Sequence, residues 1–218
     1  MTLASLSVGR RGLLGIATAA FAAIGSRSSA DAQTANHIGS IAPIQRLDGA
    51  LLGTMQAGSK MSFAQRFATL APVIEQTFDL DAILAASVGL RWPDLPNDQK
   101  AQIDAAFRRY TVASYASNFD SYDGQTFQVS PDVREVGNGE VIVRTKLVAR
   151  DGSSTPLDYV MRGGQTGWKI VDVLAGGAIS RVAVQRSDFR TLLTSGGAPA
   201  LTVALQNKVA NLSGGMHS

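Results

Sequence analysis

Four carboxylates lie inside strongly apolar stretches of the sequence, and these are the side chains whose type and surroundings favour chemistry. They are Glu75, Asp104, Asp158 and Asp172. A carboxylate in an apolar pocket acts as a general acid or base, either in a pair or alone with a raised pKa. Asp172 is the strongest candidate, because it alternates with Val171 and Val173. No spacing makes two of the four a pair, so solvated helix faces, caps and surface ion pairs stay open as alternatives.

Histidine and cysteine are nearly absent, which excludes the commonest catalytic and metal-binding designs. The 218 residues include no cysteine and two histidines, His37 and His217, near the ends of the expected mature chain. A Ser-His-Asp or Cys-His arrangement therefore lacks its base, and a zinc site lacks its usual ligands. No G-x-x-x-x-G-K-[ST] motif occurs, and residues 137–139 lack the third glycine of a dinucleotide fingerprint. We expect no catalytic residue, no cofactor and no metal ion.

The first 32 residues have the three-part form of a cleaved export signal. Arg10 and Arg11 form a basic region, residues 12–24 are apolar, and residues 30–32 form an A-x-A cleavage site before Gln33. The competing interpretation is a membrane-spanning helix, which needs about 20 apolar residues and is longer than this stretch. The twin arginine also resembles a twin-arginine signal, so the export route stays open. We expect a periplasmic protein that begins at Gln33.

Removal of this segment nearly neutralises the chain. The whole sequence carries 20 basic and 17 acidic residues, for a net charge of +3. Residues 1–32 hold three of the basic residues and one acidic residue, so the mature chain has a net charge of +1. Nucleic-acid binding requires a concentrated basic surface that neutralises phosphates. We therefore expect no nucleic-acid partner.

The first half of the mature chain has the three-and-four spacing of apolar residues that is typical of amphipathic helices. One stripe covers residues 41–55 and a second covers residues 63–78. Ser62 and Gln65 have the spacing of a capping box at the start of the second helix, and Pro72 predicts a kink near its end. Two further helices are predicted over residues 80–88 and 97–122.

From residue 125 the apolar period changes to two, which is typical of β-strands. Val143 and Leu147 share one predicted face of a strand, and Arg144 and Lys146 share the other. Turns rich in Gly, Asn and Asp separate the strands at regular intervals. We expect a four-stranded antiparallel sheet with one face covered by helices. The strands are predicted over residues 127–137, 140–150, 155–162 and 168–174.

After two glycines at 176 and 177, the spacing becomes helical again. Apolar residues from Ile179 to Leu193 predict one helix, residues 195–197 interrupt it, and Pro199 begins a final helix. The fold class is therefore α+β, with one domain over residues 33–218 that has loose ends. Small residues between the apolar stripes leave two alternatives open, a cavity between helices and sheet or tight helix packing.

Two groups of short motifs carry a resemblance to a known family. The first is Gly89-Leu90-Arg91-Trp92, Asn97-Asp98-Gln99, Phe107-Arg108-Arg109-Tyr110 and Tyr115-Ala116. The second is Tyr159-Val160-Met161-Arg162, the strand Gly167-Trp168-Lys169-Ile170-Val171-Asp172-Val173, Ile179-Ser180 and Arg186-Ser187-Asp188-Phe189. Over residues 41–212 the sequence resembles the MlaC (toluene-tolerance) family of periplasmic lipid-binding proteins, and it is similar to the hopanoid-associated HpnM branch. It departs from the family pattern at Gly177-Ala178-Ile179-Ser180 and at Gln185, which an aromatic residue often replaces.

The resemblance implies a soluble carrier, not an enzyme, that moves phospholipid or hopanoid between the inner and outer membranes. The implied partners are an inner-membrane lipid transporter complex and an outer-membrane lipoprotein complex. Acyl chains buried between sheet and helices supply about 0.8 kcal/mol per methylene group, so no specific head-group site is needed. Two other classes stay open: a small α+β enzyme that uses a buried carboxylate on an apolar substrate, and an interaction protein with a filled core.

Candidate lipid contacts are chosen from the predicted apolar faces, where ordinary core residues are the alternative. They are Phe67, Leu70, Ile74, Leu84, Val88, Phe107, Tyr110, Val143, Leu147, Tyr159, Met161 and Ile170. Four basic residues near the C-terminus form either a rim for lipid head groups or a scattered solvated set. They are Arg181, Arg186, Arg190 and Lys208.

Overall fold

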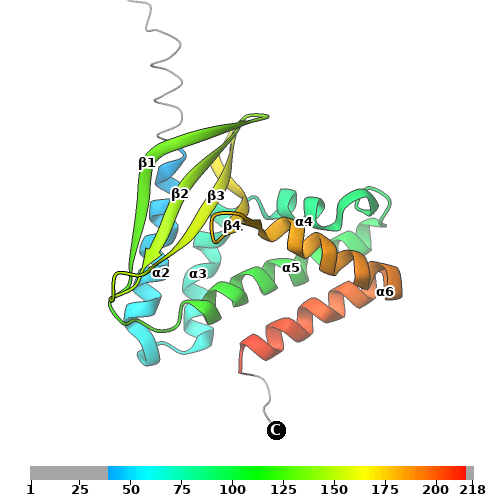
Figure 1. The fold of residues 1–218 in the computed structure, drawn as a ribbon. Helices are drawn as coiled ribbons and strands as arrows, with labels where there is room; N and C mark the ends of the chain where they lie inside the picture. Colours follow the sequence, from blue (N-terminus) through cyan, green and yellow to red (C-terminus); the bar gives the residue numbers. More distant parts are fainter. Residues whose placement is uncertain (1–38, 215–218) are drawn as a thin grey trace, which may run out of the picture.

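A computed structural model of the chain describes residues 39–214 as an α+β fold, which confirms the predicted class (Figure 1). The predicted export signal, its cleavage site and both histidines lie outside these residues. No helix in the described part of the chain is long and apolar enough to cross a membrane. The helices are α2 (Ile41–Ala57), α3 (Phe63–Thr77), α4 (Leu80–Val88), α5 (Asn97–Asn118) and α6 (Arg181–Leu212), with 3-10 turns η1 (Gly58–Lys60) and η2 (Gly89–Arg91).

The sheet is an antiparallel meander of five strands, not four, in the order β1-β2-β3-β4-β5. The unexpected strand is short: Ile179 and Ser180 pair with the end of β4 before the last helix begins. Gly176 and Gly177 have φ angles of 63° and 75°, and this left-handed backbone turns the chain back onto β4. The strands are β1 (Thr126–Gly137), β2 (Glu140–Val148), β3 (Ser154–Gly164), β4 (Gly167–Ala175) and β5 (Ile179–Ser180).

One face of the sheet packs against the helices, as the alternation in the sequence predicts. Val141 and Val143 of β2 are buried, whereas Arg144 and Lys146 are exposed. Figure 1 shows α2 and α3 lying behind the twisted sheet, and α2 contacts β1 while α3 contacts β4. The main core is therefore the layer between these two helices and the inner sheet face.

The junction of α3 and α4 fastens the helices to the sheet. Ser62 and Gln65 form the predicted capping box at the start of α3, with Ser62 N donating to Gln65 Oε1 at 2.8 Å. At the other end Phe78 forms a parallel bridge with Ile170, and Asp79 N donates to the Ile170 carbonyl oxygen at 2.9 Å. The Asp79 side chain then caps α4 by accepting from Ala82 N at 3.0 Å. This junction fixes α4 beside β4.

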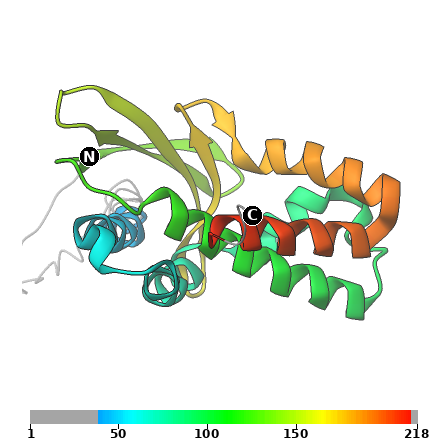
Figure 2. The same ribbon diagram turned by 90° about the horizontal axis from the view of Figure 1, so that it is seen from below.

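The α5 and α6 helices form the second half of the molecule. The predicted interruption of the last helix is confirmed, because Gly197 has φ 67° and ψ −162° and bends α6 into two segments. Figure 2 shows both segments running beside α5, and α6 contacts α4 and α5. The α5 helix ends at Asn118, earlier than predicted, because Phe119 leaves the helix with ψ 58°. The chain then passes beneath the sheet to β1.

Candidate functional site

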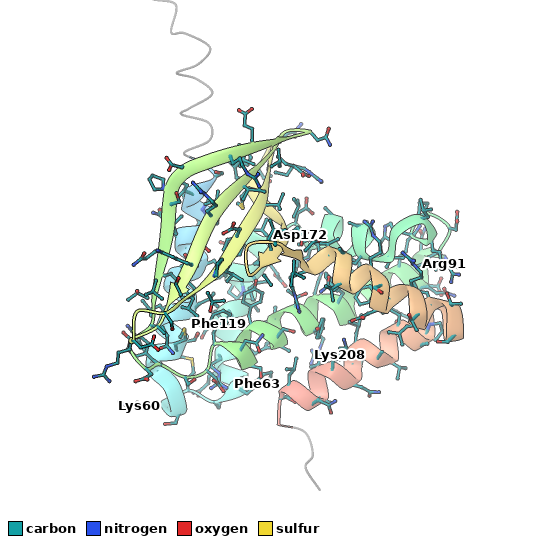
Figure 3. All side chains as sticks on the ribbon, viewed as in Figure 1. Lys60, Phe63, Arg91, Phe119, Asp172 and Lys208 are labelled. Carbon is teal, nitrogen blue, oxygen red and sulfur yellow. The ribbon has the colours of Figure 1, made fainter. Side chains whose placement is uncertain are left out.

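A cavity of about 320 Å³ lies where α5 and the first turns of α6 meet the β4 end of the sheet. Its wall comes from α4, α5, β3, β4 and α6 and is mainly apolar. Figure 3 shows Asp172 beside the start of α6 and Phe119 at the end of α5, and both line the cavity. Segments that are distant in the sequence therefore build this wall together.

Aromatic side chains form one side of the cavity. Tyr115 lies between Phe78 and Phe119, with ring centroids 5.5 Å and 5.8 Å away, and the Tyr115 and Phe119 rings are stacked. Phe119 in turn lies 6.0 Å from Phe127 of β1. Such ring pairs gain energy beyond their buried area. This aromatic wall, defined here as Phe78, Tyr115 and Phe119, continues from the cavity to the outer strand of the sheet.

Asp172, the carboxylate favoured by the sequence, lines the cavity but serves the fold. Its carboxylate accepts hydrogen bonds from Val173 N at 2.7 Å, Val182 N at 3.1 Å and the Ser180 hydroxyl. The bond to Val182 satisfies an amide at the start of α6 that has no partner within the helix. Asp172 therefore holds β4, β5 and α6 together at the edge of the cavity.

The other three carboxylates also have structural or surface positions. Asp104 accepts from Arg108 Nε at 2.8 Å one turn along α5, and Arg108 also pairs with Asp81. Asp158 accepts from the backbone amide of Thr145 at 3.1 Å. Glu75 is exposed on α3. These positions agree with the alternative of caps, ion pairs and solvated faces, and none of the three lines the cavity.

The carboxylate that the sequence analysis missed is Asp48, on the buried face of α2. Asp48 is 6% exposed, and burial raises the pKa of its carboxyl group to about 7. Neither carboxylate oxygen has a hydrogen-bond partner among the described residues. The signal was present in the sequence, because position 48 falls between Ile44 and Leu51 on one helical stripe. A charge on that stripe marks a buried ionisable group.

Phe107 and Tyr110 are the two predicted lipid contacts that line the cavity. The other ten predicted residues do not line the cavity, and their contact with lipid stays a prediction. Phe67 is half-buried beneath Arg109, and Leu147 is half-buried near the end of β2. The buried core positions are Leu70, Ile74, Leu84, Val88, Val143, Tyr159, Met161 and Ile170.

The four basic candidates occupy separate positions along α6. Arg181 lines the cavity, and Arg190 is exposed. Arg186 donates from Nε to the Ala86 carbonyl oxygen at 2.8 Å. Lys208 lies 5.4 Å from the ring centre of Tyr110 and 4.0 Å from an Asp188 carboxylate oxygen. Of the four, Arg181 is the one placed directly at the cavity.

A second hollow, about 590 Å³ in volume, lies between α5 and the second segment of α6. Its lining is also mainly apolar, with Ala105, Ala106, Val209 and Ala210 beside Gln102 and Gln206, but it includes no aromatic side chain. It does not reach the sheet. Within residues 39–214 there is also no group of three or more His, Cys, Asp or Glu side chains that could hold a metal ion. The cavity with the aromatic wall is therefore the stronger candidate for an apolar ligand.

Comparison with known proteins agrees with this architecture. A solved structure of the phospholipid-binding protein from Ralstonia solanacearum, in complex with a phospholipid, matches with a TM-score of 0.69. The match covers 80% of this chain and 98% of that protein at 20% sequence identity, so it shows a shared fold. A family model described as MlaC protein matches residues 45–207. The chain therefore belongs to the MlaC protein family.

Proposed function

We propose that the protein is a lipid carrier that binds acyl chains between its sheet and helices. The observation that supports this most directly is the cavity of about 320 Å³ with its aromatic wall, in a chain of the MlaC family. A shared fold with a protein that was solved with a phospholipid bound gives further support. Apolar burial provides affinity for hydrocarbon without any reacting group.

The proposed cargo is a phospholipid, with a hopanoid as the second candidate from the HpnM resemblance. The cavity is near the lower limit of small-molecule sites, which span roughly 300 to 1,000 Å³. A lipid with two acyl chains therefore requires the layer between sheet and helices to open further. Mass spectrometry of lipid that copurifies without detergent distinguishes the two cargoes.

We place this carrier in the periplasm, between an inner-membrane lipid transporter complex and an outer-membrane lipoprotein complex. The predicted export signal and the family support this location. A carrier that buries hydrocarbon releases it slowly. We therefore propose that a partner protein opens the cavity to release the lipid.

A cavity-filling substitution tests the binding site. Ser114 lines the cavity on α5, and its hydroxyl donates to the Tyr110 carbonyl oxygen at 2.8 Å. We expect Ser114→Trp to remain folded and to lose most of its copurified lipid, because the indole occupies the ligand's volume. Ala101→Trp is the matched control, because Ala101 is exposed on the same helix. Wild-type protein without lipid, or a Ser114→Trp protein with the wild-type lipid content, would contradict the proposal.

A second candidate function, an enzyme that acts on an apolar substrate, is favoured by one observation. Asp48 is a buried carboxyl group with a pKa raised to about 7, which suits a general acid or base. The two functions differ in turnover. If the protein is a carrier, the mass of lipid incubated with it stays unchanged. Conversion of excess lipid by wild-type protein but not by Asp48→Asn would support the enzyme.

A further inference from the structure

Three buried oxygen-bearing side chains in the main core have no hydrogen-bond partner among the described residues. They are the carboxyl group of Asp48 on α2, the hydroxyl group of Thr77 at the end of α3, and the hydroxyl group of Tyr159 on β3. Thr77 and Tyr159 have no exposed surface, and Asp48 has 6%. Buried polar groups in proteins nearly always have a partner, because an unpaired one loses its hydrogen bonds to water. Three such groups in one core therefore need a physical explanation.

The aromatic wall packs against the main core that holds these groups, and it also lines the cavity. Tyr115 lines the cavity, and the Asp48 carboxylate contributes to the raised pKa values of both Tyr115 and Tyr159, after the larger effect of burial. Thr77 precedes Phe78 of the wall in the sequence. On the same face of α2, the Thr54 hydroxyl is 3.4 Å from the Phe119 carbonyl oxygen. Asp48, Thr77 and Tyr159 do not line the cavity themselves, so a ligand in the cavity reaches them only if the aromatic wall moves.

The charge around Asp48 indicates what kind of group would pair with it. None of the ion pairs found among residues 39–214 includes Asp48, and burial is the cause of its raised pKa. A buried phosphate would need cationic partners there. Arg181, the basic residue at the cavity, is instead exposed near the start of α6. A charged head group therefore suits the cavity mouth, and an uncharged oxygen suits the core.

We propose that Asp48, Thr77 and Tyr159 form a polar pocket that hydrogen-bonds the ester carbonyl groups of the bound lipid. Each of the three side chains holds one O–H donor when it is neutral. A carbonyl oxygen accepts two hydrogen bonds and brings no competing donor, so two ester carbonyls can pair with all three. This inference rests on the proposed lipid-binding function and adds the part of the lipid that the core recognises, its ester carbonyl oxygens. The aromatic wall moves aside as the lipid enters.

Binding of two matched lipids tests the polar pocket. The probes are vesicles of diester phosphatidylcholine and of its diether analogue, which has the same head group and chain lengths but no carbonyl groups. Delipidated full-length protein is incubated with each, and bound lipid is measured by mass spectrometry after gel filtration. We expect wild-type protein to bind the diester at least about fivefold more tightly, since each lost hydrogen bond weakens binding by this order.

Substitutions at Asp48 link this preference to the polar pocket. Asp48→Leu should lose the preference for the diester and should melt at a higher temperature, because an unpaired carboxyl group has been removed from an apolar core. Asp48→Asn preserves the shape and should retain part of the preference, which covers the case in which the leucine variant does not fold. Thr54→Val is the matched control on the same face, because the Thr54 hydroxyl already donates to the Leu51 carbonyl oxygen at 2.8 Å.

The outcomes separate this inference from the proposed function. Equal binding of diester and diether by wild-type protein overturns the polar pocket but leaves the carrier intact. An unchanged preference in both Asp48 variants overturns it as well. Wild-type protein that takes up neither lipid overturns the carrier itself.

Discussion

At the scale of single residues, two carboxylates of this protein have opposite environments. Asp172 accepts three hydrogen bonds, two from backbone amides and one from a hydroxyl group, and so stabilises a corner of the fold. Asp48 accepts none among the described residues and lies on the buried face of α2. A buried carboxyl group without hydrogen-bond partners favours its neutral form. The first suits structure, and the second suits a binding site that a ligand completes.

The raised pKa of Asp48 predicts an unusual dependence of stability on pH. In the unfolded chain the carboxyl group ionises near 3.8, whereas burial raises its pKa to about 7 in the fold. Between these values the folded state binds the additional proton, so the free energy of unfolding falls as pH rises. The loss is complete above pH 7 and amounts to at most about 4 kcal/mol, from about 1.4 kcal/mol per pKa unit.

Urea unfolding of wild type and Asp48→Asn from pH 4 to pH 8 measures this effect. The amide does not titrate, so we expect the variant's stability to rise relative to wild type up to pH 7 and the difference to stay constant above it. Tyr115 and Tyr159, the titratable neighbours, stay neutral over this range because burial raises the pKa of both. Parallel pH profiles of the two proteins would show that Asp48 is not held neutral in the fold.

At the scale of elements, the bend in α6 shapes the α-helical half of the molecule. Gly197 has φ 67° and ψ −162°, a backbone region that is essentially restricted to glycine. The bend lets the two segments of α6 pack beside α5, and the first segment contributes Arg181, Val182 and Gln185 to the cavity. A straight helix of this length would project away from the molecule.

Two glycine-to-alanine substitutions test whether the bend requires glycine. Their expected effects on protein stability are opposite. Gly197→Ala should destabilise the protein by about 1 to 3 kcal/mol, because alanine is strained in this conformation. Gly53→Ala lies inside α2, and its added methyl group meets no atom within 4 Å. It should stabilise the protein by about 0.5 to 1 kcal/mol. Midpoints of urea unfolding give both values, and a stabilising Gly197→Ala would contradict the role of the bend.

At the scale of the whole molecule, two layers of different character meet at the cavity. The sheet with α2 and α3 contains the main core, and α4, α5 and α6 form the helical half (Figures 1 and 2). The aromatic wall lies at their junction, because Phe78 follows α3 while Tyr115 and Phe119 belong to the end of α5. The cavity of the proposed carrier therefore lies at the junction of the two halves.

The predicted export signal is tested by expression of the chain from Met1. We expect cells that express it to accumulate a periplasmic protein that begins at Gln33, because residues 30–32 have the A-x-A pattern of a signal-peptidase site. Fractionation followed by intact-mass measurement locates the protein and its first residue. A full-length chain that begins at Met1 and stays in the membrane fraction would reject the signal and the proposed location.

Several features of the fold could be predicted from the sequence, because each of them depends on residues that are close together in the chain. The capping box at Ser62 and the bend at Gly197 are local features that few side chains decide. The alternation in β2 likewise identifies the covered face of the sheet. Strand β5 was missed because Ile179 also suits a helical stripe, and pairing with β4 outweighed that spacing.

The tertiary structure alone decided which apolar residues border the cavity and which fill the core. Periodicity identifies the buried side of an element, but depth depends on how distant segments pack. Phe107 and Tyr110 therefore line the cavity, whereas Leu70 and Ile74, chosen by the same reasoning, are buried in the core. The burial of Asp48 without a hydrogen-bond partner has the same origin, because it depends on the distant segments that pack over α2.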